Sequence, residues 1–191
     1  SINTYKSKRY QAQQVQLARE IYIISKENNI IKLQSLIQQY GIQVLIKVVD
    51  DYIDQDEQTA LHLSASYGYN LCIEQLLQLK ANIDQSNHYG YTPLISAYIN
   101  QHYLTCSILL KYHINPFHTD HQGKTIFNYI LSNSNTHEQQ VKQLHLFKLL
   151  LLKCHAKDLV IDDDLFQKPL TSNVYYQLYT LYKENTDQFK Q

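Results

Sequence analysis

The 191-residue sequence contains no methionine, even at position 1, and no tryptophan. A chain without an initiator methionine is typical of a piece excised from a longer protein. The sequence also lacks an apolar run of about 18 residues, and its first residues, SINTYKSKRYQAQQ, contain no apolar core. Neither a membrane-spanning helix nor a secretory signal peptide is therefore predicted. We expect a soluble, cytoplasmic protein, which would act inside a host cell if it were a delivered effector.

Glycine and cysteine are scarce, and their positions exclude several kinds of chemistry. The four glycines are separated along the chain, so the sequence contains neither a phosphate-binding loop nor a dinucleotide fingerprint. The three cysteines are Cys72, Cys106 and Cys154. An odd number of widely spaced cysteines without a CxxC pair favours a reducing compartment over a disulfide framework. We predict buried thiols with no redox or metal role.

The chain has no excess of either charge, because 17 Lys and Arg residues balance 17 Asp and Glu residues. No global field would therefore steer it toward nucleic acid or anionic lipid. One weak pointer to nucleic acid is the N-terminus, which combines basic and aromatic residues: Tyr5, Lys6, Lys8, Arg9 and Tyr10. Because no stripe of Lys and Arg continues from them, we predict the start of a solvated helix and neither a nucleic-acid nor a membrane partner.

What the sequence does contain is a pattern that recurs at a fixed interval. Similar segments open at three equally spaced threonines: TALHLSASYGYNLCIEQLLQLKAN at Thr59, TPLISAYINQHYLTCSILLKYHIN at Thr92 and TIFNYILSN at Thr125. Apolar, glycine and asparagine positions keep the same register. The matched sets are Leu61, Leu94 and Phe127; Gly90 and Gly123; and Asn82 and Asn115. A fixed period of about 33 residues is typical of stacked repeats.

Each repeat has the residue order of two short antiparallel helices followed by a turn. Thr is a favourable N-cap, and Pro93 suits the first helical position because proline has no N–H. After Gly68 or Gln101, a second apolar run has helical spacing and predicts the second helix. Its inward residues are predicted to be Ile73, Leu76 and Leu77 in one repeat and Leu104, Ile108 and Leu109 in the next. The segments between repeats are rich in Asn, Asp, Ser and Gly, which predicts turns.

The 33-residue period, with TALH, TPLI and LLQLKANID, resembles the ankyrin repeat family. The resemblance implies an all-α fold: an ankyrin-repeat solenoid of stacked antiparallel helix pairs joined by turn or hairpin loops, with helical N- and C-terminal caps. The family's His after TPL is present as His62 and is expected to tie neighbouring turns together. The chain departs from the family at Ile95 and Asn128, which replace that His, and at Lys80, His113 and His155, which replace a glycine after the second helix.

We predict a single array over residues 1–191. Its parts are an N-terminal helix with a degenerate first repeat (1–53), two repeats (54–86 and 87–119), a repeat with an insertion near 132–140 (120–160), and a degenerate C-terminal capping helix (161–191). The first repeat is inferred from IYIISKENNIIKLQSLIQQYG, which resembles LHLSASYGYNLCIEQLLQLKA, with Leu33 matching Ile73 and Leu36 matching Leu76. The capping helix would turn Val174, Leu178 and Leu181 inward, because a terminal repeat needs an outer face that tolerates water.

No constellation of residues predicts catalysis. The segment HTDH places His118, Asp120 and His121 close together, near His113, but it lies in a turn without matching further ligands. We therefore predict polar turn residues there, and a solvated loop at Asp162–Asp164. The sequence predicts no catalytic residue, no metal site and no cofactor, and hence no enzyme.

The family resemblance implies that partners dock on the turn tips and on the exposed side of the first helices, which together line a concave groove. The predicted partner-binding residues are Gln55, Asp56, Gln58, Tyr67, His88, Tyr89, Tyr91, Asn100, His121, Gln122 and Lys124. Tyr67, Tyr89 and Tyr91 would share one face, and tyrosine is enriched at binding hot spots because it offers large area with few rotatable bonds. The groove carries few net charges, which predicts recognition by shape with weak salt dependence.

We therefore predict a non-catalytic protein-protein interaction module that binds another protein and is monomeric by itself. Two other functions remain open: a targeting or scaffolding region of a larger enzyme or secreted host-directed effector, and a structural subunit of a large assembly. Because one repeat fold serves many unrelated ligands, the sequence does not identify the partner.

Overall fold

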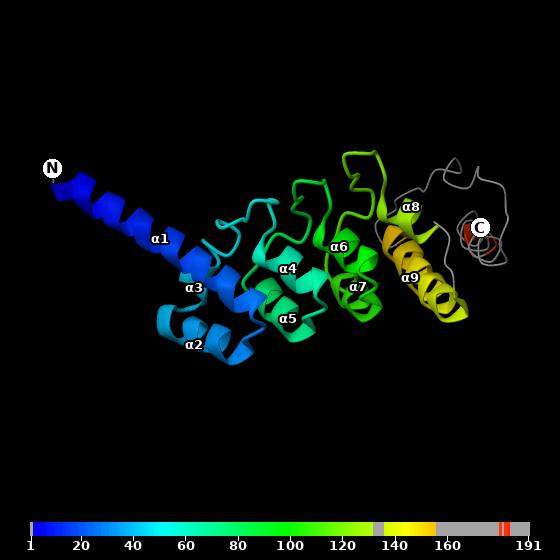
Figure 1. Cartoon of the computed structure of the whole chain (residues 1–191), viewed down its shortest axis with the longest axis horizontal. Coiled ribbons are helices and arrows are strands. Elements are labelled where there is room, and N and C mark those ends of the chain that lie inside the picture. The colour runs from blue at the N-terminus through cyan, green and yellow to red at the C-terminus, as the bar shows by residue number, and fades with distance from the viewer. Residues whose placement is uncertain (1, 132–135, 156–179, 181, 184–191) are drawn as a thin grey trace. The chain divides into compact units, whose positions relative to one another are not determined.

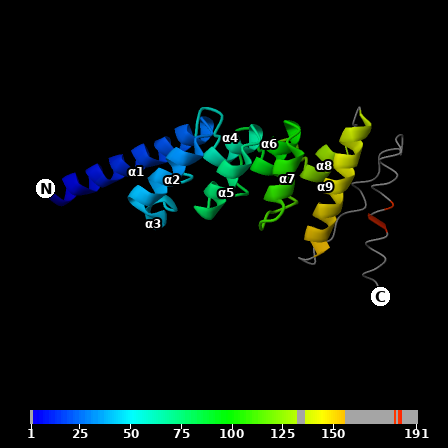
Figure 2. The same ribbon diagram turned by 90° about the horizontal axis from the view of Figure 1, so that it is seen from below.

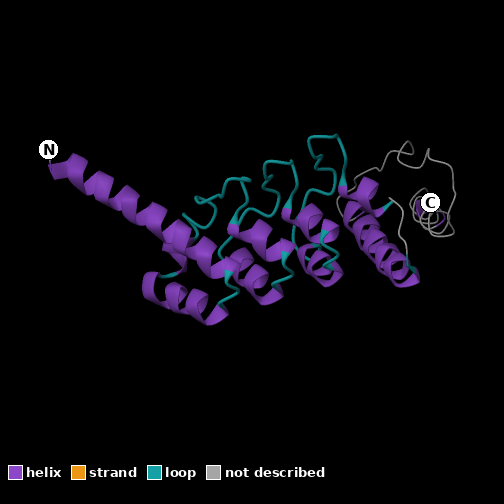
Figure 3. Cartoon of the chain, in the orientation of Figure 1, coloured by secondary structure: helices purple, strands orange, loops and turns teal. Residues whose placement is uncertain are grey.

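The computed structural model describes residues 2–131, 136–155, 180 and 182–183. These residues form helices and turns and no strand (Figures 1 and 3). The helices are α1 (Ile2–Lys26), α2 (Ile30–Tyr40), α3 (Ile42–Leu45), α4 (Ala60–Ser66), α5 (Asn70–Gln78), α6 (Pro93–Ile99), α7 (Tyr103–Leu109), α8 (Ile126–Ile130) and α9 (His137–His155). The all-α class predicted from the sequence is confirmed for this part of the chain.

The chain divides into two compact units, Ser1–Thr105 and Cys106–Gln191, and the boundary falls within α7. In the first unit, α4 packs against α1, α5 and α6, and α2 packs against α1 and α5 (Figure 2). Leu33, Leu61 and Ile73 are fully buried between these helices. Short helices cannot bury an apolar face alone, so each pair depends on the pair next to it.

Helices α4, α6 and α8 each begin after a threonine, as the sequence predicts. The Thr59 and Thr92 hydroxyls each accept a hydrogen bond of 3.4 Å from the backbone N–H three residues later, and Pro93 occupies the first turn of α6. At Thr125 the cap is reversed, since Asn128 Oδ1 accepts bonds from the Thr125 N–H (2.8 Å) and hydroxyl (2.9 Å). These bonds satisfy N–H groups that have no partner within a helix.

Helices α1, α4 and α6 are each followed by a left-handed residue, which reverses the chain into the second helix. Asn28, Gly68 and Gln101 have φ of 52°, 71° and 63°. In each case the next N–H bonds to a carbonyl five residues earlier: Asn29 to Ile24 (3.0 Å), Tyr69 to Ser64 (2.8 Å) and His102 to Ala97 (2.9 Å). This is the Schellman arrangement, which satisfies carbonyls at a helix end.

In the second unit, α8 and α9 enclose an aromatic core. Phe127 and Phe147 are fully buried with ring centroids 5.9 Å apart, and Phe117 lies 5.8 Å from Phe127. The predicted insertion near 132–140 lies partly outside the described part of the chain, at residues 132–135, and α9 begins within it at His137. The predicted inward residues Val174, Leu178 and Leu181, and the loop at Asp162–Asp164, also lie outside the described residues. The repeat boundaries stay a prediction.

The prediction that Leu104 faces the core is wrong. Its side chain is 67% exposed, whereas Thr105 and Cys106 are buried at the same end of α7. The apolar spacing predicted Leu104 to face the core. The same helical period is also satisfied when the buried side of α7 begins one residue later, at Thr105. Ile31 and Leu71, which follow the first residue of α2 and α5, are exposed in the same way.

Candidate functional site

The turn tips are built on one side-chain acceptor that recurs at the period of the repeats. The acceptors are Asp54, Asn87 and Asp120, at the start of three tips that we define as tip 1 (54–58), tip 2 (87–91) and tip 3 (120–124). Each Oδ1 accepts bonds from the N–H groups two and four residues later, at 2.7 to 3.0 Å. A backbone bond from the first residue's N–H to the fifth residue's carbonyl closes each tip. All three tips therefore share one conformation.

The fourth residue of each tip has a left-handed backbone, with φ of 57° at Glu57, 79° at Gly90 and 73° at Gly123. Glycine reaches this region without strain, whereas a glutamate is sterically strained there. Asp120 is predicted as a turn residue from the HTDH segment, whereas its equivalents Asp54 and Asn87 are not predicted. Their position one and two repeat periods before Asp120 is the signal that could have found them.

Tip 2 is bonded both to tip 1 and to the start of α4, all within the first unit. The His88 N–H donates to the Asp56 carbonyl (2.9 Å), and His62 Nε2 lies 2.9 Å from the Tyr91 carbonyl. Because the Thr59 N–H donates to the other ring nitrogen of His62 (3.3 Å), Nε2 is assigned the proton and donates to Tyr91. His62 thus ties the start of α4 to the next tip, as the family resemblance predicts.

Burial lowers the pKa of His62 to about 4, against the partial opposing effect of its bond to the Tyr91 carbonyl. Its ring is fully buried and neutral near pH 7. A neutral imidazole with both nitrogens bonded to backbone is a structural tie, and its geometry leaves no nitrogen for a substrate.

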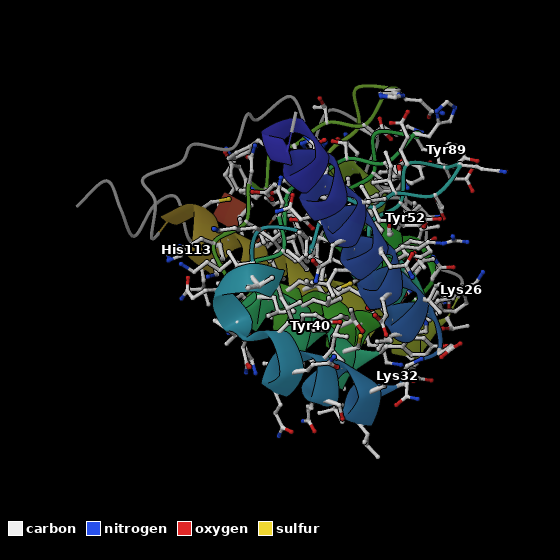
Figure 4. The ribbon with its side chains drawn as sticks, turned by 90° about the vertical axis from the view of Figure 1, so that its left-hand side faces the viewer. Lys26, Lys32, Tyr40, Tyr52, Tyr89 and His113 are labelled. Atoms are coloured by element: carbon white, nitrogen blue, oxygen red, sulfur yellow. The ribbon has the colours of Figure 1, made fainter. Side chains whose placement is uncertain are left out.

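Two of the three predicted tyrosines pair with each other, and the third pairs with Tyr69, which was not predicted. Tyr89 and Tyr91 stack with ring centroids 5.7 Å apart, and His88 meets Tyr89 edge-on at 5.6 Å. Tyr67 stacks instead on Tyr69, with centroids 5.4 Å apart, across the turn at the end of α4. Tyr67 (53% exposed) and Tyr89 (51% exposed) offer large ring surface. Figure 4 shows Tyr89 at the outer edge of the turns.

The two tyrosine pairs lie at opposite ends of α4. The Tyr91 carbonyl is bonded to His62 in the first turn of α4, whereas Tyr67 is the C-cap of the same helix. The stretch from His62 to Tyr67 spans about 7 Å of helix. A partner that contacted both pairs would have to lie along the whole of α4.

Most other predicted binding residues lie exposed on the tips or at a helix end. Exposed residues are Gln55, Asp56, His88 and Asn100 in the first unit and His121, Gln122 and Lys124 in the second. Gln58 is half-buried, and its backbone closes tip 1. The structure thus brings together the predicted residues of tips 1 and 2, while those of tip 3 belong to the second unit.

Tip 3 differs from the other tips in its charge. Asp120 is buried, and burial alone would raise its pKa, but hydrogen bonds from the Tyr129 hydroxyl and from two backbone N–H groups hold the pKa below its usual value. Lys124 lies 5.9 Å from the centre of the Tyr129 ring. Tyr129 of α8 therefore contacts both Asp120, through its hydroxyl, and Lys124, through its ring.

The expectation of few net charges fails for tip 1. Tip 1 contains Asp54, Asp56 and Glu57 and no Lys or Arg, whereas Asp120 and Lys124 balance each other in tip 3. Glu57 was also left out of the predicted binding set. The first unit therefore presents a distinctly acidic tip next to an aromatic one.

The three thiols are buried, as predicted. Desolvation raises the pKa of Cys106 to about 12, so its thiol is protonated at neutral pH. Among the described residues, no three His, Cys, Asp or Glu side chains gather in a way that could hold a metal ion. No described helix is both long and apolar enough to cross a membrane.

Stacked pairs of short helices, joined by tips of one repeated conformation, define the class of helical repeat proteins. A comparison with family models finds ankyrin repeats (3 copies) over residues 21–120, which is more than half of the chain. The protein belongs to the ankyrin repeat family.

Similar curated proteins are much longer than this chain. Rabankyrin-5 of Mus musculus is 34% identical over 82 residues, covering 42% of this chain and 7% of its own length. Synphilin-1 of Mus musculus is 32% identical over 82 residues, covering 43% of this chain and 8% of its own length. Rabankyrin-5 of Homo sapiens is 36% identical over 76 residues, covering 38% of this chain and 6% of its own length. The chain thus spans less than a tenth of the relatives it matches.

Proposed function

We propose that the chain binds another protein through tips 1 and 2 and the exposed end of α4. Ankyrin repeats are generally protein-protein interaction modules and are typically non-catalytic, which supports this class of function. The observation that carries the proposal is the half-exposed Tyr89 on a tip whose shape does not depend on it. Its backbone N–H is held by Asn87 at 3.0 Å, and its ring stacks on Tyr91 at the surface.

A rigid tip lowers the entropy lost on binding, because the aromatic side chains are already positioned. Tyrosine adds a large apolar face with a polar end, which suits a contact surface that is exposed before binding. The second pair, Tyr67 and Tyr69, would extend the contact to the far end of α4. We expect recognition of a folded or extended protein segment lying across these elements.

The test compares Tyr89→Ala/Tyr91→Ala with Tyr112→Ala, which removes an exposed tyrosine outside the tips. Each chain serves as bait for proteins of the source cell, and affinity for any captured partner is then measured with purified components. We expect the double variant to lose more than about 1 kcal/mol of binding free energy, about fivefold in Kd, with nearly unchanged thermal stability. Equal affinities of the double variant and the unmodified chain would reject this surface.

A second candidate is a targeting or scaffolding region within a longer protein. Its supporting observation is the small share, 6% to 8%, that the matching segment occupies in the relatives. The sequence of the complete gene product tests it, since a flanking catalytic domain would support this candidate and its absence would contradict it.

A further inference from the structure

Charge is segregated along the chain although its sum is zero. Between Lys47 and Lys80 the sequence contains no Lys or Arg and six acidic residues: Asp50, Asp51, Asp54, Asp56, Glu57 and Glu74. Residues 81–110 add Asp84 and again no Lys or Arg. Residues 48–110 thus carry seven acidic residues against the single Lys80, and three of the seven lie in tip 1, next to the aromatic tip 2.

Within tip 1, the three acidic side chains have different tasks. Asp54 shapes the turn, because its Oδ1 accepts the N–H groups of Asp56 and Gln58 and its Oδ2 accepts the Tyr22 hydroxyl at 2.5 Å. Asp56 and Glu57 are exposed at the outer end of the tip. These two carboxylates are the ones that a partner can reach.

Tip 1, which carries the exposed carboxylates, is bonded through its backbone to tip 2, which carries the Tyr89 and Tyr91 rings. The His88 N–H donates to the Asp56 carbonyl at 2.9 Å, which fixes tip 2 against tip 1. Tyr89 follows His88 directly and stacks on Tyr91. An aromatic face beside carboxylates attracts a cation in two ways, through the ring quadrupole and through ion pairing.

We propose that tips 1 and 2 bind a lysine or arginine side chain on a basic segment of the partner protein. This inference rests on the proposed function and adds the chemistry of the partner to it. The cationic group lies against the Tyr89 and Tyr91 rings, and Asp56 and Glu57 pair with its charge. Acidic and phosphorylated segments are repelled by the same carboxylates.

The probe is a library of random peptides of about twelve amino acids, displayed on phage and selected on the full chain. Selected peptides are synthesised, and their Kd is measured by fluorescence anisotropy. We expect the selected sequences to be enriched in Lys and Arg. Raising the salt from about 50 mM to about 500 mM should weaken their binding about fivefold, because exposed charges are screened.

The test variant is Asp56→Asn/Glu57→Gln. It removes both negative charges, keeps the size of both side chains, and leaves a residue other than glycine at the left-handed position 57. We expect it to weaken binding of the selected peptides about tenfold. The matched control is Glu27→Gln/Glu74→Gln, which changes net charge equally at positions away from the tips and should leave Kd unchanged. Thermal unfolding of all three chains shows whether each variant is folded.

The outcomes separate the two proposals. Loss of binding in Tyr89→Ala/Tyr91→Ala, with no loss in Asp56→Asn/Glu57→Gln, would retain the surface and overturn the basic partner. Loss of binding in Asp56→Asn/Glu57→Gln, with no loss in Tyr89→Ala/Tyr91→Ala, would overturn both the tyrosine surface and the basic partner lying against it. The rings would then have no part in binding. Selection of neutral or acidic peptides would also overturn the basic partner, as would equal losses in the test and control charge variants.

Discussion

His62 is the residue on which the contact between neighbouring repeats depends most directly. One ring nitrogen accepts the Thr59 N–H at the start of its own helix, and the other donates to the Tyr91 carbonyl of the next tip. A charged imidazolium could not accept the Thr59 bond, and its charge would be buried without a carboxylate bonded to the ring. Folding therefore favours the neutral form.

We predict that stability falls as the pH is lowered from about 6.5 to about 4. The unfolded chain protonates His62 near its ordinary pKa of about 6.5, whereas the folded chain does so only near a pKa of about 4. The unfolded state thus binds more protons in this window, and stability is lost at up to about 1.4 kcal/mol per pH unit. Urea unfolding at pH 7 and pH 5 should differ by about 2 kcal/mol from this residue.

The control for this prediction is His62→Asn. Asparagine already occupies the equivalent position of a later repeat, as Asn128. This variant should be less stable at pH 7 but should lose less stability between pH 7 and pH 5. Parallel pH dependences in the variant and the unmodified chain would show that another group is responsible.

The structural role of a residue could be predicted from the sequence where that residue type has few possible roles at its position. His62 and the buried cysteines were correctly interpreted because a histidine or thiol in these positions has few alternatives. Leu104 was misplaced because the helical period allows two neighbouring registers at a helix start, and burial of Thr105 and Cys106 decides between them. The Thr105 hydroxyl also donates to Asn70 Oδ1 of α5 at 2.7 Å, a bond that the apolar pattern does not predict.

At the scale of elements, the backbone conformation and hydrogen bonds at the helix ends are kept from repeat to repeat even where the residues differ. Lys80 replaces the family's glycine, yet it adopts φ of 60°, and the Ala81 N–H still bonds to the Leu76 carbonyl at 3.0 Å. The Schellman end of α5 is thus kept with a residue that is strained in it. The hydrogen bonds of the repeat impose this conformation on a side chain that does not favour it.

Lys80→Gly is predicted to stabilise the chain by about 0.5 to 1 kcal/mol. The left-handed conformation costs an L-residue about 1 to 2 kcal/mol, and the greater freedom of glycine in the unfolded chain cancels part of the gain. Lys80 is exposed, so little packing is lost. The measurement is the urea midpoint of the variant against that of the unmodified chain.

The matched substitution Lys148→Gly, at an exposed position inside α9, should have the opposite sign and destabilise by about 1 kcal/mol. A loss of stability in Lys80→Gly as well would contradict the strain argument.

Helix starts were predictable from Thr59, Thr92 and Pro93, because capping is a local property of the chain. The turn tips were harder to predict, since Asp54 and Asn87 are different residues with one task and Glu57 stands where the other tips have glycine. Gly68 and Gln101 share a conformation, but a side chain at position 68 would also require a neighbour to shift. A Cβ at position 68 would lie 2.6 Å from His102 Nδ1, a contact that only the fold reveals.

At the scale of the whole molecule, composition hides the distribution of charge and of apolar surface. A net charge of zero coexists with an acidic segment between Lys47 and Lys80, and the predicted weak salt dependence followed from the few charges among the predicted groove residues, which left out Glu57. Similarly, the first unit exposes Ile31 (79%), Leu71 (65%) and Leu104 (67%) at equivalent positions of its second helices. Such a set of exposed aliphatic residues is the feature that would favour a subunit of a larger assembly.

We nevertheless predict that the chain is monomeric by itself. A stable interface buries about 800 Å² on each partner, and three separated aliphatic side chains supply well below that area. Polar residues also surround them, including exposed Lys32 and half-buried Glu74. Sedimentation velocity from micromolar to submillimolar concentrations should give one species with the mass of a single chain. A concentration-dependent dimer that Leu71→Ser/Leu104→Ser abolishes would contradict this prediction and identify these residues as a self-association surface.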